Sequence, residues 1–289
     1  MTRVADLVEL VRAPAALSVP GDVVAGAAAA GALGPRTPAL ATASVLLYWA
    51  GMAANDWADR KLDAVERPER PIPSGRISPG AAVGLAAGLT AAGVGLAAAA
   101  GGRRAAAVAV PLAATIWGYD LLAKNTAAGP AVMAACRGLD VLLGAAGGRP
   151  LRALPAAVTV AAHTWTVTAL SRREVDGADK ALPLRTLAGT ALVAASAAVP
   201  PGRRAVGAVA AALPAVLAGW YAARYGAAQA RVVSEPTAGR VRAAVGAGIT
   251  GLPALQGALT ARAGAGLLGV AVAAAAPLGR RLARKVSPT

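Results

Sequence analysis

Long apolar runs recur along the whole of this sequence. A run of about 20 apolar residues is enough for a helix to cross the hydrocarbon core of a bilayer. Charged residues make up only 15% of the chain, below the roughly one quarter that is usual in soluble domains. Because the runs are repeated, the assignment to a membrane does not depend on one segment. The sequence predicts an all-α, polytopic transmembrane helix bundle that forms one domain over residues 1–289.

The candidate spans are separated by short segments rich in Pro, Gly and paired charges, which are turn signals. The segment around Arg262 is short, so the pattern allows either nine or ten spans. The first 13 residues alternate apolar and charged positions at helical spacing, and we expect them to lie on the membrane surface. The spans cover approximately residues 15–33, 38–54, 79–101, 104–122, 127–147, 152–170, 183–200, 204–223, 239–260 and 263–279.

The net charge of +15 would suggest nucleic acid binding in a soluble protein, but here the basic residues flank the apolar runs. Basic residues are enriched in cytoplasmic loops. With the N-terminus inside, 20 of the 29 Lys and Arg residues lie on the cytoplasmic side, eight lie outside and Arg137 lies within a span. We therefore expect a multi-pass protein of a bacterial cytoplasmic membrane, with its aspartate-rich loops inside and no nucleic acid partner.

Acidic residues are concentrated in two short windows at predicted cytoplasmic helix ends. Of the 14 acidic residues, five lie between Asp56 and Glu69 and three between Glu174 and Asp179. A solvated loop with local ion pairs is the plainer interpretation of such a concentration. The spacing in the first window favours a binding site instead.

Four oxygen-bearing side chains in this window have helical spacing. Asn55, Asp59 and Asp63 are at i, i+4 and i+8, and Asp56 begins a second series at i, i+3 and i+7. If the preceding helix continues, all four project from one face. Neighbouring carboxylates repel one another unless a cation is present, and hard oxygen donors suit Mg²⁺, which shares its shell with substrate phosphates. The loop that follows carries Arg67, Arg70 and Arg76 and has anion-binding capacity.

These segments resemble the UbiA superfamily of intramembrane prenyltransferases. Residues 55–63 read NDWADRKLD and residues 70–78 read RPIPSGRIS, a long and specific match to the family's first motif. Tyr119 and Lys124 are similar to its Tyr/Lys element, and residues 137–144 to its fifth-helix stretch. The resemblance covers about residues 10 to 225.

The resemblance implies a helical bundle, usually of nine spans, around a central cavity that opens sideways to lipid. Two aspartate-rich motifs would hold Mg²⁺, which neutralises charge on the departing diphosphate of an isoprenyl diphosphate. The prenyl group would pass to an acceptor that the sequence does not identify, with diphosphate released and water kept out by the apolar cavity. The resemblance also implies that the protein is surrounded by, and contacts, membrane lipid.

The resemblance also assigns roles to the matching positions. The implied catalytic residues are Asp56, Asp59, Asp63 and Lys124. The implied metal ligands are Asn55, Asp56, Asp59 and Asp63, with Glu174 and Asp176 in the second window. The residues implied to bind substrate are Asn55, Arg70, Tyr119, Arg137, Asp140, Arg172 and Arg173.

The second window departs from the family pattern. When it is aligned on Leu182-Pro183, Glu174 takes one acidic position and Leu170 the earlier one. Arg172 and Arg173 add positive charge where the family has negative charge, which puts a second metal site in doubt. The segment Leu-Ser-Arg-x-Glu-Val at residues 170–175 resembles the Ebo-type C proteins, a subgroup found in bacterial biosynthetic gene clusters.

Several ionisable residues fall within the predicted spans, where such groups are costly and tend to be functional. Arg137 and Asp140 are one turn apart, so they either serve a cavity or form a structural ion pair. Asp22 and Asp120 are candidates for the cavity wall. His163, the only histidine, is interpreted as a hydrogen-bonded packing residue rather than a base.

Two other functions fit the same pattern. A terpene cyclase on this scaffold would capture the cation with the substrate's own double bond and would need no acceptor. A transporter or binding protein for an anionic lipid would release no diphosphate.

Overall fold

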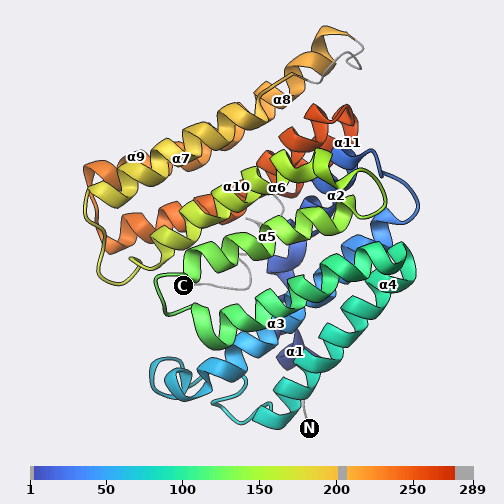
Figure 1. Cartoon of the computed structure of the whole chain (residues 1–289). Helices are drawn as coiled ribbons and strands as arrows, with labels where there is room; N and C mark the ends of the chain where they lie inside the picture. Colours follow the sequence, from blue (N-terminus) through green and yellow to red (C-terminus); the bar gives the residue numbers. More distant parts are fainter. Residues whose placement is uncertain (1–2, 201–206, 277–289) are drawn as a thin grey trace.

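The computed structural model describes residues 3–200 and 207–276, in which every regular element is a helix (Figure 1). The ends of two predicted spans lie outside these ranges, with Arg203, Arg204 and the basic residues from Arg280 onward. The helices are α1 (Val4–Leu10), α2 (Pro20–Ala30), α3 (Thr37–Glu66), α4 (Pro79–Gly118), α5 (Gly129–Ala145), α6 (Pro150–Ser171), α7 (Ala181–Ala197), α8 (Ala208–Tyr221), α9 (Ala227–Ser234), α10 (Ala238–Arg262) and α11 (Gly266–Ala273).

The predicted all-helical membrane bundle is confirmed. Among the described residues, three stretches are long and apolar enough to cross a membrane: Thr37–Glu66, Pro79–Ala123 and Pro150–Ser171. Ala181–Ala197 is a shorter apolar helix. The two predicted spans at 79–101 and 104–122 are the two arms of α4.

A hairpin at Gly102 separates these arms. Gly102 has φ 65° and ψ −158°, a conformation that is open to glycine and rarely adopted by other residues. The arms run back along each other, as Figure 1 shows, and Trp117 Nε1 donates a hydrogen bond to Thr90 Oγ1 at 3.1 Å across them. The hairpin brings the start of α5 back to the end of α3 that carries the aspartates.

Helix α3 continues to Glu66, well beyond the apolar run that was predicted to end at residue 54. Its apolar part packs against α4, where Gly93 lies beside Leu47. Small residues at such contacts let transmembrane helices approach closely. The extension therefore projects the acidic stretch from a helix that is held in the bundle, as the spacing predicted.

Helix α1 lies against the loop that follows α3. It exposes Val4 but buries Asp6 and Leu10, consistent with the predicted surface helix. Arg76 donates hydrogen bonds to Asp6 at 2.8 Å and to Glu9 at 2.6 and 2.9 Å. The N-terminal helix and the Arg-Pro-rich loop are thus joined through one guanidinium group.

We expect Arg76→Gln to release α1, because it removes the ion pairs to Asp6 and Glu9. A spin label on Val4→Cys, in a Cys136→Ala background, should become more mobile in the variant. The backbone N–H of Arg3 and the side chain of Arg76 lower the pKa of Asp6 below 3.8. A lowered carboxyl pKa gives stability that is complete above the unfolded value and is lost as pH falls through the folded value.

The wild-type label should therefore gain mobility only below about pH 4, while the variant's label is mobile throughout. Equal mobility of the two proteins at pH 7 would show that Arg76 does not hold α1.

Candidate active site

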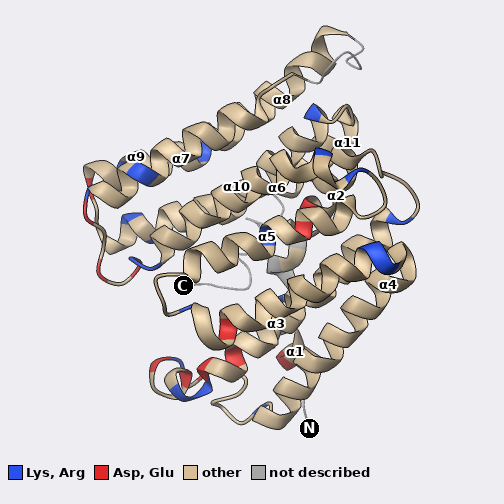
Figure 2. Ribbon diagram, in the orientation of Figure 1, with Lys and Arg blue, Asp and Glu red and all other residues tan. Residues whose placement is uncertain are grey.

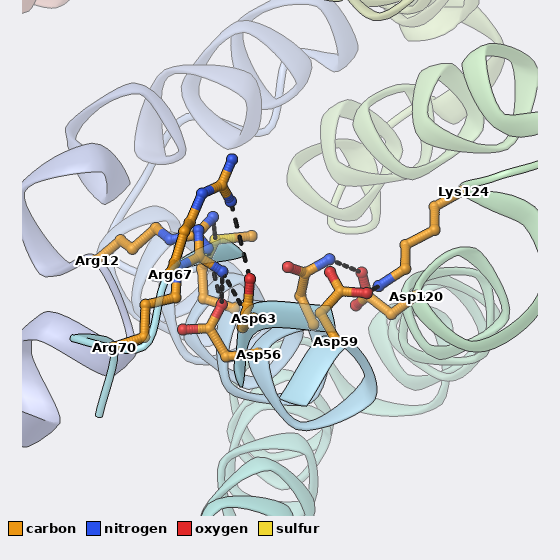
Figure 3. Close-up of polar contacts among 10 residues, drawn as sticks. Arg12, Asp56, Asp59, Asp63, Arg67, Arg70, Asp120 and Lys124 are labelled. Atoms are coloured by element: carbon orange, nitrogen blue, oxygen red, sulfur yellow. Dashed lines mark hydrogen bonds and ion pairs between the residues drawn. The ribbon is translucent and has the colours of Figure 1, made fainter. Parts of the chain in front are cut away.

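The four oxygen-bearing side chains of α3 divide into two groups. On a helix with 100° per residue, Asn55, Asp56, Asp59 and Asp63 span about 100° of the surface. Asp56 and Asp63 point toward arginines at one edge of this arc, whereas Asp59 points toward Lys124 and Asp120 at the other (Figure 3). The four side chains thus share one broad face, as the spacing predicted, and this face contributes to two neighbouring clusters.

The first group, which we call the arginine cluster, consists of Asp56, Asp63, Arg12, Arg67 and Arg70. Arg70 Nη1 lies 2.7 Å from Asp63 Oδ2 and 3.3 Å from Asp56 Oδ1. Arg12 Nη2 lies 2.7 Å from the same Asp56 oxygen, and Arg67 Nη1 lies 3.9 Å from Asp63 Oδ1. Three guanidinium groups face two buried carboxylates, so the cluster has a surplus of positive charge.

Arg12 was not predicted as a site residue. Its backbone is left-handed, with φ 47°, the only positive φ outside glycine among the described residues. Such a conformation is costly for a side-chain-bearing residue and is concentrated at functional sites. In the sequence, Arg12 is only the last charged residue before the first apolar run. That position does not indicate that its partner is Asp56, 44 residues away.

The second group, the lysine cluster, consists of Asn55, Asp59, Asp120 and Lys124. Lys124 Nζ lies 2.5 Å from Asp59 Oδ1, and Asn55 Nδ2 donates to Asp120 Oδ1 at 3.1 Å. Two carboxylates and one ammonium leave a surplus of negative charge. A π-helical turn over Tyr119–Ala123 ends α4 here, and such turns frequently occur at functional sites.

An apolar cavity of about 130 Å³ begins at Asp120 and lies between α3, the second arm of α4 and α5. Tyr119, Arg137 and Asp140, which were predicted to bind substrate, all line it. The rest of its wall consists of Val19, Ser44, Leu47, Tyr48, Gly51, Met52, Leu112, Ile116, Met133 and Cys136.

The charged groups deep in this cavity have partners that the sequence did not indicate. Arg137 Nε lies 2.8 Å from Asp22 Oδ2, and Gln256 Nε2 donates to the other Asp22 oxygen at 2.6 Å. Asp140 Oδ1 accepts a hydrogen bond from Ser44 at 2.5 Å. Arg137 thus has its described ion pair with Asp22 of α2 rather than with Asp140 one turn away.

The second acidic window forms a loop between α6 and α7. Asp179 Oδ1 accepts a hydrogen bond from the Leu182 backbone N–H at 2.9 Å, which satisfies an orphan donor of the first turn of α7. Arg172 donates to the Thr126 carbonyl, and Arg173 and Asp176 are exposed.

Glu174 is the half-buried member of this loop. Burial raises the pKa of its carboxyl, an effect opposed by the nearby positive charges of Arg242 and Arg67. Arg67 belongs to the arginine cluster and also approaches Asp63 of α3, so Glu174 lies within the electrostatic influence of that cluster. His163, as predicted, is a buried packing residue, and its Nδ1 lies 2.8 Å from the Tyr221 hydroxyl.

The lysine cluster has the chemistry that Mg²⁺ requires. Within the described ranges, three Asp, Glu, His or Cys side chains do not converge on one point. Asp59, Asp120 and the Asn55 amide nevertheless supply hard oxygen donors with surplus negative charge, and a cation, the Lys124 ammonium, is already held against Asp59. Mg²⁺ is usually bound by one or two carboxylates plus substrate phosphates, so the residues present fit this ion.

Comparison with known proteins agrees with these features. The sequence pattern of the UbiA prenyltransferase family matches residues 18–233. The digeranylgeranylglyceryl phosphate synthase of Natronomonas pharaonis is 35% identical over 192 residues, which are 65% of this chain and 69% of that one.

Two solved structures share the fold. A structure of digeranylgeranylglyceryl phosphate synthase in membranes has a TM-score of 0.68 and 17% identity, over 91% of this chain and 99% of that chain. The apo structure of a UbiA homolog from Aeropyrum pernix K1 has a TM-score of 0.65 and 20% identity, over 88% and 96%.

The polytopic helical bundle, with acidic and basic clusters beside an apolar cavity, has the features of an intramembrane enzyme. The chain belongs to the UbiA prenyltransferase family, and it is a membrane prenyltransferase. Its relatives do not favour a terpene cyclase or a lipid transporter. The narrower resemblance to Ebo-type C proteins stays a prediction.

Proposed function

We propose that this prenyltransferase moves the prenyl group of an isoprenyl diphosphate to the hydroxyl of a lipid that carries a glyceryl phosphate. The observation that carries the proposal is the pair of oppositely charged clusters on one helix face. The lysine cluster suits a Mg²⁺-bound diphosphate, and the arginine cluster beside it suits a second phosphate. The name of the Natronomonas relative supports a glyceryl phosphate as that second group.

Asn55, Asp59 and Asp120 of the lysine cluster would hold Mg²⁺, which when bound would supply positive charge to the diphosphate leaving group. Asp56 and Asp63, the other two ligands that the family motif implies, would instead position Arg12 and Arg70 for the second phosphate. Lys124 would donate to diphosphate oxygens and thereby stabilise the charge that builds up on departure, whereas Arg70 would contact the second phosphate. The apolar wall of the cavity excludes water from the prenyl group. Asp120 of the lysine cluster and its neighbour Tyr119 line the cavity, where they would orient the reacting end of the prenyl chain.

Glu174 and Asp176 are proposed to assist a second ion from the loop that faces Arg67, and Arg172 and Arg173 to contact the outer diphosphate oxygens. We also propose that the protein forms one domain in a bacterial cytoplasmic membrane, with its N-terminus and both acidic windows on the cytoplasmic side. The excess of basic residues on that side supports this orientation.

The proposal is tested with the purified protein in nanodiscs, Mg²⁺, a panel of C10 to C20 isoprenyl diphosphates and a prenylated glyceryl phosphate. We expect diphosphate release that matches ether product formed and that stops when EDTA removes the metal. An aromatic acceptor serves as the comparison and should give little product.

Formation of a cyclic hydrocarbon without any acceptor would refute the proposal and show that the protein is a terpene cyclase. Diphosphate release matched only by the aromatic acceptor would refute the glyceryl phosphate assignment and leave the prenyltransferase class intact.

A further inference from the structure

One end of the bundle is rich in arginine and free of acidic residues. It comprises the turns at residues 31–36, 101–104 and 146–152 and the end of α10, and it lies opposite the two clusters on α3 (Figure 2). None of its arginines takes part in an ion pair of the described residues, whereas Arg12, Arg67, Arg70 and Arg76 near α3 do. These arginines are Arg36, Arg103, Arg104, Arg149, Arg152 and Arg262.

Three of these arginines line one hollow of about 580 Å³. Arg104 comes from the α4 hairpin, and Arg149 and Arg152 come from the start of α6. The Arg149 backbone N–H donates to the Ala30 carbonyl at 3.1 Å, which fixes this turn against α2. The hollow therefore has a defined backbone and three guanidinium groups that face no carboxylate within the described chain.

Positive charge is concentrated at the hollow. Arg149 is the N-cap of α6 and Arg152 lies in its first turn, where the helix dipole is positive and negative charge is preferred. Arg104 adds a third positive charge beside them. A phosphate group would relieve this repulsion, and guanidinium groups bind phosphate with paired hydrogen bonds.

An apolar stripe leads away from the same hollow along α6. Leu151 is 78% exposed, Leu154 is 42% exposed and Val158 is 65% exposed. Their spacing of i, i+3 and i+7 places them on one helix face. A ligand with a phosphate at one end and hydrocarbon chains at the other matches the charge of the hollow and the stripe together, whereas a free phosphate matches only the hollow.

We propose that Arg104, Arg149 and Arg152 bind the phosphate of an anionic phospholipid, whose acyl chains lie along Leu151, Leu154 and Val158. This lipid site is at the end of the bundle remote from the prenyl transfer site. It is independent of the proposed reaction. It gives the protein a structural lipid that neutralises the arginine-rich end.

The test compares lipid binding by the full chain in detergent micelles, followed by native mass spectrometry and by the melting temperature. Phosphatidylglycerol should bind the wild type and raise its melting temperature. The combined variant R104Q/R149Q/R152Q should bind on the order of a hundredfold more weakly, because each basic residue contributes to attraction of an anionic lipid. Phosphatidylcholine and inorganic phosphate should have little effect on either protein.

The matched control is R185Q/R224Q/R231Q, which removes three exposed positive charges elsewhere and should bind phosphatidylglycerol like the wild type. If the combined variant is not monodisperse, Arg149→Gln alone should weaken binding severalfold. The proposal is overturned if the arginine variants keep the wild-type affinity, if the control loses as much, or if phosphatidylcholine or inorganic phosphate reproduces the stabilisation.

Discussion

Asp59→Asn is expected to lower prenyl transfer by on the order of a thousandfold while the protein stays folded. Asp59 would hold the Mg²⁺ that neutralises the leaving diphosphate, and removing one element of such electrostatic stabilisation typically costs two to three orders of magnitude in rate (about 10²–10³). Asp59 is partly exposed, with 24% of its side chain accessible, and Asn has the same shape, so the fold has no reason to change. Diphosphate release measures the effect.

The control for this experiment is Glu66→Gln, which removes a carboxylate two turns further along the same helix. Glu66 is exposed and has no ion pair among the described residues, so its loss should change the rate by less than about twofold. If Asp59→Asn retains more than a tenth of the wild-type rate, the lysine cluster is not the site of the reaction.

Two explanations for the Asp59 effect can be separated with Mg²⁺. If Asp59 binds the metal, the variant needs more Mg²⁺ for half its maximal rate. If Asp59 only orients Lys124, its loss should resemble Lys124→Gln, which lowers the maximal rate with an unchanged Mg²⁺ requirement. The 2.5 Å contact between these two side chains makes the comparison necessary, since either variant leaves the other residue without its partner.

Local spacing predicted the helix through Asp63, but it could not predict how the carboxylates would divide. Helical periodicity fixes the direction of a side chain relative to its own helix. The partner is fixed by tertiary packing, and Arg12 and Lys124 reach α3 from opposite directions along the chain. The two clusters therefore depend on how the segment after α1, the end of α3 and the π-helical turn pack together.

The partners of the charged residues in the deep cavity were even harder to predict from local spacing. Arg137 and Asp140 were recognised as unusual because charge is expensive at membrane depth. The partner of Arg137 is Asp22, which also binds Gln256, a residue 234 positions further along the chain. Neither periodicity nor motif spacing contains information about contacts of that range.

The second acidic window was recognised in the sequence as a departure from the family, and the structure gives a physical basis for it. Arg172 is directed to the Thr126 carbonyl, and Asp179 serves the first turn of α7. One basic and one acidic side chain of the window thus stabilise loops. The departure of the second window from the family pattern could be recognised from residue types alone, whereas these loop contacts could not.

Gly144→Ala is expected to destabilise the protein by roughly 3 kcal/mol or more, the upper part of the range for overpacked cores. A Cβ at Gly144 would overlap the Val23 carbonyl of α2, and a Cβ at Gly26 would overlap the Val141 carbonyl of α5. The two helices therefore meet backbone to backbone, with one glycine on each side. Backbone atoms cannot turn aside as a flexible side chain can, so α2 and α5 must separate.

Separation of these helices would also weaken the ion pair in the cavity, since Asp22 lies on α2 and Arg137 on α5. Breaking one buried ion pair by removing its partner costs about 3–5 kcal/mol, so even partial loss adds to the overpacking. Unfolding in a denaturing detergent measures the change, with Gly88→Ala as the control because a Cβ there meets no atom within 4 Å. Gly88→Ala should leave stability unchanged or slightly raised. Equal stability of the two variants would mean that α2 and α5 can move apart freely, and the Asp22–Arg137 pair would then not depend on their close contact.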